Sequence, residues 1–459
     1  MWKSILLLLC ITYVHGAEKV NKQIINKNVE RSIDLTSQLV KISSVITIEN
    51  AGKESVQNYL IVVESPVNGN LSIITVKDAL KEDVKFKPAE IEGRKDLTAY
   101  NVILKQPLDS GRATVITVET IFTKSLVPHP TSILQKEKQL VRYFGNAYLY
   151  SPYNTKKQTT NVALSSRSIE NYTKLKPSSQ SDSTITYGPF QDIQSYSNEE
   201  IVVHYENNAP FLTVSRLERN IEISHWGNIA IEENIEIHHT GAKLKGPFSR
   251  YDYQRDSGSA HSIKSYRTIL PAAAHSIYYR DSNGNISTSN VKTRNEWTEL
   301  ELKPRFPLFG GWQSSYTLGY SVPSYQYLYK NKLGEYVLNM RLIDHVFDDM
   351  HVEELETSIV LPVGVSNIRV KTPYETKRLD DGVTYKYLDS IGRTIIKLRK
   401  NNLVEQHIQD FEIKYEWKFT LLFHEPLLLT LAMFVLFVFA IIYVRLDFSL
   451  KKTEHQKKE

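Results

Sequence analysis

Acidic and histidine side chains gather between residues 344 and 354, where their types could hold a divalent cation. Carboxylate oxygens and imidazole nitrogens are common protein ligands of such ions. The same composition is typical of a solvated acidic loop, which is the interpretation we prefer for Asp344, His345, Asp348, Asp349, His351, Glu353 and Glu354. His238 and His239 are adjacent on an expected strand, so their side chains should point to opposite faces and cannot easily share an ion. We therefore expect no metal site and no cofactor.

The sequence contains none of the local motifs that mark common catalytic centres. A G-x-S-x-G nucleophile elbow, a Gly-rich phosphate loop, a zinc-type cysteine array and an H-E-x-x-H pair are all absent from it. The paired carboxylates of a glycosidase would not be visible in this way, because the fold sets their separation. We expect no catalytic residues and keep a carbohydrate-processing enzyme as the alternative.

A mixed aromatic and basic segment, residues 243–255, follows the tryptophan of a His-Trp-Gly sequence. Aromatic residues and arginines are enriched at protein interfaces. An equally good interpretation is a structural corner, with tyrosines packed inward and arginines paired to Asp252 or Asp256. Under the first interpretation the candidate interface residues are Trp226, Phe248, Arg250, Tyr251 and Tyr253.

Three Asn-x-Ser/Thr triplets are candidate acceptors for N-linked glycans. They begin at Asn70, Asn171 and Asn285, each in or beside a polar or turn-like segment. Such triplets also arise often by chance.

The elements that must position these residues are mainly strands. Val, Ile, Thr and Tyr alternate with polar residues over much of the chain, as at residues 45–49 and 229–232. Alternation with period two predicts half-buried strands. Gly and Asn tolerate positive φ and mark turns at residues 50–52, 68–70, 109–111, 283–285 and 380–382. The pattern predicts a mainly β, antiparallel, sandwich-like fold.

The β region contains an internal repeat. Residues 31–36 resemble 219–224, residues 46–52 resemble 235–241, and residues 107–111 resemble 307–311. Matches in the same order at a nearly constant offset predict two tandem, duplicated β domains. We place the first at residues 17–217 and the second at 218–420.

Two segments of the β region are expected to differ from strands. Residues 132–143 hold the best pattern for a short amphipathic helix, and few other helices are expected. Residues 165–197 are dense in Ser, Thr, Asn, Gln and Asp, which predicts a long surface excursion of the first domain.

Apolar runs at both ends fix the expected compartment. Residues 1–16 read as a signal peptide, with Lys3 before a short apolar core and Gly16 near the cleavage region. Residues 426–444 are predicted to form a transmembrane helix. Its run of uncharged residues would be about 27 Å long as a helix, which is enough to cross a thin bilayer. Arg445 and the lysines of the 445–459 tail follow it, so the tail should be cytosolic and the body luminal or extracellular.

Charge and cysteine content limit which kinds of protein this chain could be. The net charge of +5 over 459 residues is modest and widely spread, so we expect no binding to nucleic acid. Cys10 is the one cysteine and would leave with the signal peptide. A disulfide-free body in an oxidising compartment must be stable by packing alone, which predicts large domains.

Several segments resemble the ribophorin I family. The likeness is dense from about residue 221 to 449 and thinner over the first domain. It is carried by residues 224–230 (SHWGNIA), 241–254, 270–274 (LPAAA), 278–281 (YYRD), 305–312 (RFPLFGGW), 402–410 (NLVEQHIQD) and 443–449 (YVRLDFS).

This resemblance implies a subunit of the oligosaccharyltransferase of the endoplasmic reticulum membrane, which N-glycosylates nascent proteins. In that assembly a separate multi-spanning subunit carries out the transfer with a divalent metal, so the implied role is accessory and non-catalytic. The implied partners are the other subunits and nascent acceptor polypeptides, with the translocon as a further candidate. A cell-surface β-domain receptor is the other alternative, although such receptors ordinarily carry disulfides.

One feature departs from part of that family. Animal members usually carry a long cytosolic extension associated with the ribosome, whereas only residues 445–459 follow the apolar segment here. The chain looks more like the short-tailed fungal members or a truncated form, so the resemblance leaves ribosome contact through such an extension open.

Overall fold

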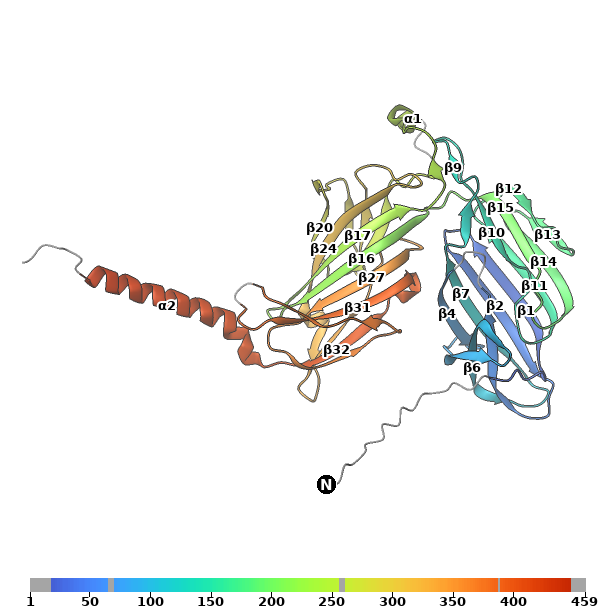
Figure 1. Cartoon of the computed structure of the whole chain (residues 1–459), viewed down its shortest axis with the longest axis horizontal. Helices are drawn as coiled ribbons and strands as arrows, with labels where there is room; N and C mark the ends of the chain where they lie inside the picture. Colours follow the sequence, from blue (N-terminus) through green and yellow to red (C-terminus); the bar gives the residue numbers. More distant parts are fainter. Residues whose placement is uncertain (1–17, 65–69, 256–260, 387–388, 447–459) are drawn as a thin grey trace, which may run out of the picture.

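The computed structural model describes residues 18–64, 70–255, 261–386 and 389–446, and strands dominate it. Figure 1 shows two β units side by side and a long helix, α2 (His424–Arg445), that leaves the second unit on the side away from the first. We call strands β1 to β15 the first unit and strands β16 to β32 the second unit. The expected signal peptide and residues 447–459 of the expected tail lie outside the described residues.

The first unit has one long sheet and two smaller sheets. The long sheet has the order β13-β14-β11-β1-β2-β7-β4, and the smaller sheets have the orders β12-β15-β10-β8 and β3-β6-β5. The strands are β1 (Ile24–Leu35), β2 (Val40–Asn50), β3 (Val56–Val63), β4 (Asn70–Asp78), β5 (Phe86–Ile91), β6 (Arg94–Leu108), β7 (Ala113–Thr123), β8 (Leu126–Pro128), β9 (Ser132–Ile133), β10 (Leu140–Asn146), β11 (Thr155–Leu164), β12 (Ile169–Tyr172), β13 (Ser178–Ser181), β14 (Thr184–Ile193) and β15 (Glu200–Glu206).

The second unit repeats this plan. Its long sheet has the order β21-β20-β24-β17-β16-β27-β31-β29, with β30 also paired to β31, and its smaller sheets are β25-β26-β32-β28 and β19-β23-β22. The strands are β16 (Leu212–Ile223), β17 (Asn228–His239), β18 (Lys243–Leu244), β19 (Tyr266–Pro271), β20 (His275–Asp281), β21 (Gly284–Asn285), β22 (Asn290–Thr293), β23 (Trp297–Leu302), β24 (Gln313–Pro323), β25 (Leu328–Lys330), β26 (Tyr336–Arg341), β27 (His351–Val360), β28 (Ser366–Lys371), β29 (Lys377–Arg378), β30 (Gly382–Thr384), β31 (Arg393–Val404) and β32 (Asp410–Glu416).

Helices are few in the described part of the chain. Besides α2 there is one short α-helix, α1 (Arg250–Arg255), which lies at the far end of the second unit in Figure 1. The 3-10 helices are η1 (Ser324–Gln326), η2 (Glu405–His407) and η3 (Phe419–Phe423). The mainly β fold with one C-terminal apolar helix, predicted from the sequence, is confirmed.

Each long sheet buries one face under both of its smaller sheets. Burial in β2 alternates at every residue, as period-two packing requires. In the first unit, Ile42 packs with Tyr205 of the four-stranded sheet. Ile46, on the same strand and face, packs instead with Tyr59 of the three-stranded sheet. The two smaller sheets therefore cover successive stretches of one sheet face, which makes each unit a two-layer sandwich.

The predicted duplication is visible in the strand pairing. The pairs β1 with β11 and β16 with β27 are parallel, and each of these central strands also pairs antiparallel with the strand that follows it in sequence. Most of the remaining strands of the two units correspond in order and position; β21 and β30 are extra strands of the second unit, and β9 and β18 pair with each other. The prediction of antiparallel sheets is wrong at the pairs β1 with β11 and β16 with β27 and at the short pair of β9 with β18, which is also parallel. Alternation within a strand does not reveal the direction of a partner about a hundred or more residues away.

Residues aligned by the sequence repeat make the same contacts in both units. The N–H of Gly111 donates to the carbonyl of Asn50 (2.8 Å), and the N–H of Gly311 donates to the carbonyl of His239 (2.9 Å). The side chains of Asn50 and His239 each accept from the backbone N–H two residues later, at 2.9 and 3.1 Å. Both glycines have positive φ (73° and 84°), where a side chain would be strained.

Three expectations from the sequence need correction. Residues 132–143 form β9 and the start of β10 rather than a helix, and residues 165–197 contain β12, β13 and β14 rather than a structureless excursion. Both segments are polar because they include edge strands with one face in solvent. The expected boundary at residues 217 and 218 lies inside β16, and the chain passes between the units over residues 207–211.

A buried arginine occupies the equivalent position of each central strand. Arg31 of β1 donates to the carbonyls of Asn146 (2.5 Å) and Tyr148 (2.7 Å), where the two smaller sheets meet. Arg219 of β16 is fully buried and pairs with the carboxylates of Glu233 and, at 2.9 Å, Asp344. A buried cation needs such partners because its desolvation is costly.

The burial of Asp344 corrects the expected solvated loop. The side chains of Asp344, His345 and His351 are buried, whereas Asp348 is exposed. The Tyr320 hydroxyl also donates to Asp344. The acidic character of the segment therefore arises in part from the carboxylate that neutralises Arg219.

The two units contact each other through apolar and polar side chains. Leu39, Ile73 and Ile121 of the first unit pack on Val404 of the second. The Asn402 side chain accepts from the Thr123 hydroxyl (2.7 Å) and donates to the Leu71 carbonyl (3.0 Å). At the opposite edge, β9 pairs with β18.

Replacing Glu233 with glutamine should change how stability depends on pH. Burial raises the pKa of Glu233 to about 7. The positive charge of Arg219 lowers this pKa, and the negative charge of Asp344 raises it, but burial is the largest effect. The folded protein thus retains a proton that the unfolded chain releases above pH 4.5. This stabilisation is fully present below pH 4.5 and is lost as pH rises through 7. The advantage of wild type over Glu233→Gln should fall by up to about 3 kcal/mol over that range, measured by denaturant unfolding of the full chain in detergent.

The comparison must be between variant and wild type, because buried histidines act in the opposite sense. Burial lowers the pKa of His225, His351 and His407 to about 4, so these groups add stability as pH rises from about 4 to 6.5 in both proteins. Glu236→Gln, on the exposed face of the same strand, is the control and should keep the wild-type profile. Identical pH profiles for both variants would contradict the role given to Glu233.

Candidate functional site

Two carboxylates are the best candidates for an acid or base, and an arginine pairs with each of them. Glu233 has a raised pKa, as a general acid requires, but it is only 1% exposed and paired with Arg219, so a substrate cannot reach it. Asp281 borders a cavity of about 270 Å³ on the second unit, but Arg305 pairs with it at 2.6 Å and lowers its pKa. Among the described residues, no three His, Cys, Asp or Glu side chains gather as a potential metal site.

The structure separates the candidate interface residues into two places. Trp226 lies in the turn between β16 and β17, whereas Phe248, Arg250, Tyr251 and Tyr253 lie in or beside α1. The turn and α1 are near opposite ends of β17, whose 12 residues extend about 40 Å. Trp226 therefore cannot act together with the others on one small partner.

The α1 corner combines both interpretations of its sequence. Phe248 packs against Phe309 and Trp312, with ring centroids 5.4 and 5.8 Å apart, and against Tyr253. Arg250 and Tyr251 are exposed on the outside of the corner, Tyr251 by 71%. The inward rings support a structural corner and the outward pair stays a predicted interface.

Polar contacts attach this corner to the first unit. Ser249 and Gln135 exchange two hydrogen bonds of 2.9 and 3.0 Å, and Asp252 pairs with Lys136 at 3.1 Å. Hydrogen bonds from Ser249 and Lys136 lower the pKa of Asp252. The corner thus links the units as well as presenting Arg250 and Tyr251.

The three candidate glycan acceptors are exposed but differ in their surroundings. Asn171 lies in the edge strand β12 of the first unit, and Asn285 lies in the short edge strand β21 of the second. Asn70 is the first residue of β4, and the hydroxyl of Ser72 in the same triplet donates to the carbonyl of Asn402 (2.6 Å). Occupancy of each stays a prediction, and the triplet at Asn70 is the one that adjoins the second unit.

The most elaborate polar cluster lies where the second unit meets α2. Arg393 is buried and pairs with Asp389 (2.7 Å), Glu222 (3.4 Å) and Glu425 of α2 (2.9 Å). Burial opposes ionisation of Asp389, but hydrogen bonds from Arg393 and a backbone N–H outweigh it and lower its pKa. His424, which precedes Glu425, contacts the Ser390 hydroxyl at 2.6 Å.

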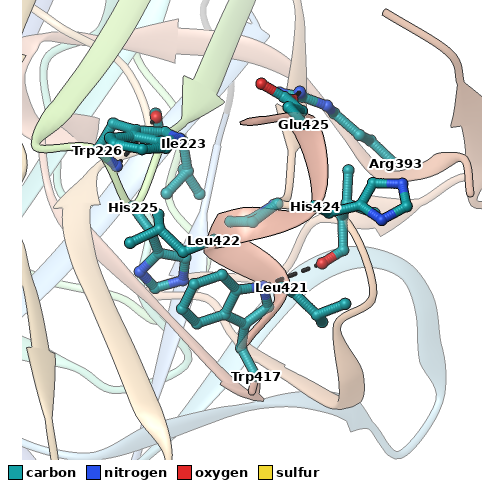
Figure 2. A pocket seen from close by; sticks show the side chains of 12 residues that line it. Ile223, His225, Trp226, Arg393, Trp417, Leu421, Leu422, His424 and Glu425 are labelled. Atoms are coloured by element: carbon teal, nitrogen blue, oxygen red, sulfur yellow. Dashed lines mark hydrogen bonds and ion pairs between the residues drawn. The ribbon is translucent and has the colours of Figure 1, made fainter. Parts of the chain in front are cut away.

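Aromatic residues form the other side of this junction. Figure 2 shows His225, Trp226 and Trp417 on one side of the chain that enters α2, and Arg393 on the other. The His225 ring stacks on Trp417 at 3.8 Å, and the Trp417 indole donates to the Val363 carbonyl (3.0 Å). Burial lowers the pKa of His225 to about 4, so the ring is neutral in this stack at pH 7.

The junction fixes the start of α2 to the second unit. Phe419–Arg445 is the one described stretch long and apolar enough to cross a membrane, and none of its apolar window is buried by the rest of the chain. Sequence reasoning found this helix but missed Arg393 and His225, which are far from it in sequence. The pairing of a buried arginine with Glu425 could not be read from spacing.

A second cavity, of about 350 Å³, lies between the units. It is lined by Leu39, Lys124, Phe211, His238 and Glu353, among others, and Lys124 pairs with Glu353 across the boundary at 2.8 Å. Its walls mix apolar and charged side chains without a convergent set of reactive groups. The arrangement holds the units together rather than presenting a reaction centre.

Replacing Arg393 with methionine should destabilise the second unit strongly. The variant leaves the buried Asp389 carboxylate without its cation and releases Glu425 of α2. Removing one partner of a buried pair costs about 3 to 5 kcal/mol. Thermal and denaturant unfolding of the purified full chain would measure this loss, and Arg393→Met with Asp389→Asn should recover part of it.

The control for that variant is an exposed arginine on the same sheet. Arg378 pairs with Asp381 at 2.6 Å with both side chains well exposed. Arg378→Met should therefore cost less than about 1 kcal/mol. Equal losses for Arg393→Met and Arg378→Met would show that the junction cluster adds no special stability.

Comparison with solved structures gives low scores. The crystal structure of an M1 zinc metallopeptidase from Deinococcus radiodurans aligns over 44% of each chain, with TM-score 0.26 and 12% identity. Native yeast LTA4 hydrolase aligns over 43% of this chain and 31% of its own, with TM-score 0.28 and 7% identity. Scores of this size carry no conclusion about fold or chemistry.

Sequence relatives are much closer and cover nearly the whole chain. Dolichyl-diphosphooligosaccharide–protein glycosyltransferase subunit 1 of Caenorhabditis elegans is 42% identical over 92% of this chain and 72% of its own. Subunits 1A and 1B of Arabidopsis thaliana are 37% and 38% identical, over 98% and 92% of this chain and 74% and 93% of their own. The family model described as Ribophorin I matches residues 24–444. The chain belongs to the ribophorin I family.

Proposed function

We propose that this protein is a non-catalytic subunit of an oligosaccharyltransferase complex, which N-glycosylates nascent proteins at the endoplasmic reticulum membrane. The main support for this proposal is the similarity of nearly the whole chain to proteins named as subunit 1 of dolichyl-diphosphooligosaccharide–protein glycosyltransferase. The apolar helix α2 supports a single-pass anchor. The basic residues after it favour a type I orientation with the β units in the lumen.

The non-catalytic role is supported by the chemistry available in the described residues. The raised-pKa carboxyl, Glu233, is enclosed with Arg219, and Asp281 is held by Arg305. A general acid or base must come within hydrogen-bond reach of its substrate. Chemistry would then come from a multi-spanning partner subunit.

Two linked β units can support such a partner by holding acceptor chains near it. The inter-unit contacts and the Arg393 junction connect α2 to both units as one framework. Tethering an acceptor turns an encounter into a local search and raises its effective concentration at the active subunit. The proposed role is therefore assembly of the complex and positioning of acceptor polypeptides.

Affinity purification of the tagged full chain in mild detergent tests membership of the complex. We expect multi-spanning membrane proteins to co-purify in a fixed ratio, together with transfer of glycan from a lipid-linked donor to an acceptor peptide. The chain stripped of its partners should show no transfer, and recombination with them should restore it.

Two outcomes would contradict the proposal. One is turnover of a carbohydrate substrate by the isolated chain, and the other is its purification without multi-spanning proteins. Protease added to sealed microsomes should spare the β units and remove only the tail, and digestion of the β units would exclude the luminal orientation.

The exposed pair at the α1 corner gives a variant that separates assembly from folding. Arg250→Ala with Tyr251→Ala removes side chains that point outward, so the melting temperature should stay within about 2 °C of wild type. If the corner is an interface, recovery of the partner subunits or glycosylation of weak acceptors should fall by about tenfold or more, as loss of an interfacial hot spot does. Quantitative mass spectrometry of the purified complex measures recovery.

The matched control is Phe248→Ala, which removes an inward ring of the same corner. It should lower the melting temperature because it leaves a void beside Phe309 and Trp312. A fully assembled and fully active Arg250→Ala, Tyr251→Ala variant would favour a purely structural corner.

A further inference from the structure

Large apolar side chains stay exposed around the start of α2. Trp226 is 63% exposed in the turn between β16 and β17, and Tyr385 is 69% exposed in the loop after β30. Ile391 of that loop and Phe419 and Phe423 of η3 are also exposed. We call these five residues the juxtamembrane patch. Such a concentration of exposed apolar surface marks a contact with a partner or a membrane.

Contacts on both sides of the junction place the patch at the level of the first turn of α2. Trp226 lines the same cavity as Leu421 and His424, and Figure 2 shows it beside the chain that enters α2. On the other side, Ser390, the neighbour of Ile391, contacts His424 at 2.6 Å. Three separate segments of the fold therefore bring exposed apolar side chains to one level.

The same level is where the helix would enter a bilayer. The 22 residues of α2 extend about 33 Å, close to the thickness of a hydrocarbon core of about 30 Å. Residues just before the helix then lie in the headgroup region. Tryptophan and tyrosine are enriched in that region because each has an apolar ring and a polar atom.

We propose that the juxtamembrane patch rests in the headgroup region of the bilayer and forms a second membrane contact beside α2. Trp226 and Tyr385 insert their rings among the lipid headgroups, while Phe419 and Phe423 occupy the same layer below the second unit. The inference rests on the proposed membrane anchoring by α2 and adds a lipid contact made by the β framework itself.

The chemistry of the patch favours lipid over a protein partner. Its members come from three segments, of which one lines the cavity beside Leu421 and another contacts His424 through Ser390, so they form a rim rather than one groove. A fluid headgroup layer can contact such a rim without shape complementarity, whereas a protein interface has a packed core. Exposed Lys418, which precedes Phe419, adds a cation suited to lipid phosphates.

A second contact would restrict the tilt of the β units over the membrane. A single helix with a flexible entry leaves the attached body free to rock about one point. Here Arg393 ties the first turn of α2 to the second unit, and the patch would hold the unit against the surface. The height of both units above the bilayer would then be fixed, as a platform for acceptor chains requires.

Quenching of tryptophan fluorescence by brominated lipid tests the contact directly. The full chain, purified with its co-purifying subunits, is placed in nanodiscs of phosphatidylcholine whose bromine atoms lie near the headgroup or near the chain end. The helix α2 contains no tryptophan, so it adds no signal of its own. The emission of Trp226 is obtained as wild type minus Trp226→Phe.

We expect the Trp226 emission to fall at least about twofold with bromine near the headgroup and less with bromine near the chain end, as for an interfacial ring. The control is Trp312→Phe, at the opposite end of β17, whose difference signal should not be quenched. Both variants keep an aromatic ring and should fold. Repeating the measurement with the chain alone in the same nanodiscs should give the same quenching.

An unquenched Trp226 signal would overturn the proposal. So would quenching of the chain alone that disappears in the complex, because a partner protein would then cover the patch. Co-purification of other subunits is recorded on the same sample. Absence of those subunits would contradict the proposed function, while the quenching readout of the chain alone would still decide the lipid contact.

Discussion

Each unit depends on an arginine buried on the covered face of its long sheet. A sandwich with one large sheet and two smaller ones has a seam where the smaller sheets meet. Backbone carbonyls and carboxylates that face this seam are buried and need hydrogen-bond donors. Arg31 satisfies two carbonyls at the seam of the first unit, and Arg219 pairs with Glu233 and Asp344 in the second. Without the cation, each seam would enclose unpaired acceptors at a cost that packing alone could not offset.

The sequence predicted much of this architecture because strands and turns leave local patterns. Alternation identified β2 and β17, and the repeat aligned Asn50 with His239, whose contacts are equivalent. Parallel pairing of β1 with β11 could not be predicted, since direction and register are set by residues distant in sequence. The polar edge strands β12 and β13 resembled a loop because one of their faces is in solvent.

Functional surfaces were less accessible to sequence reasoning than the fold. Trp226 and the α1 residues were grouped because they are close in sequence, but a long strand separates them. The junction with α2 was missed because Arg393, Glu222 and Glu425 meet only in the folded unit. Of the exposed apolar side chains around that junction, Trp226 alone was predicted from the sequence as an interface residue, because exposure depends on the folded surface. Spacing reveals chemistry within one element, whereas this protein assembles its surfaces from several.

The parallel pairs also impose an order on folding during synthesis. After β1 and β2 have formed a hairpin, the free edge of β1 must wait for β11, about 120 residues later in the chain. At about 5 to 20 residues per second this delay is on the order of ten seconds, during which an unpaired edge is exposed. The second unit repeats the delay between β16 and β27. A newly made chain therefore passes twice through a state in which a free strand edge can pair with the wrong strand. Protection of the free edges of β1 and β16 would then determine how much of the chain folds correctly.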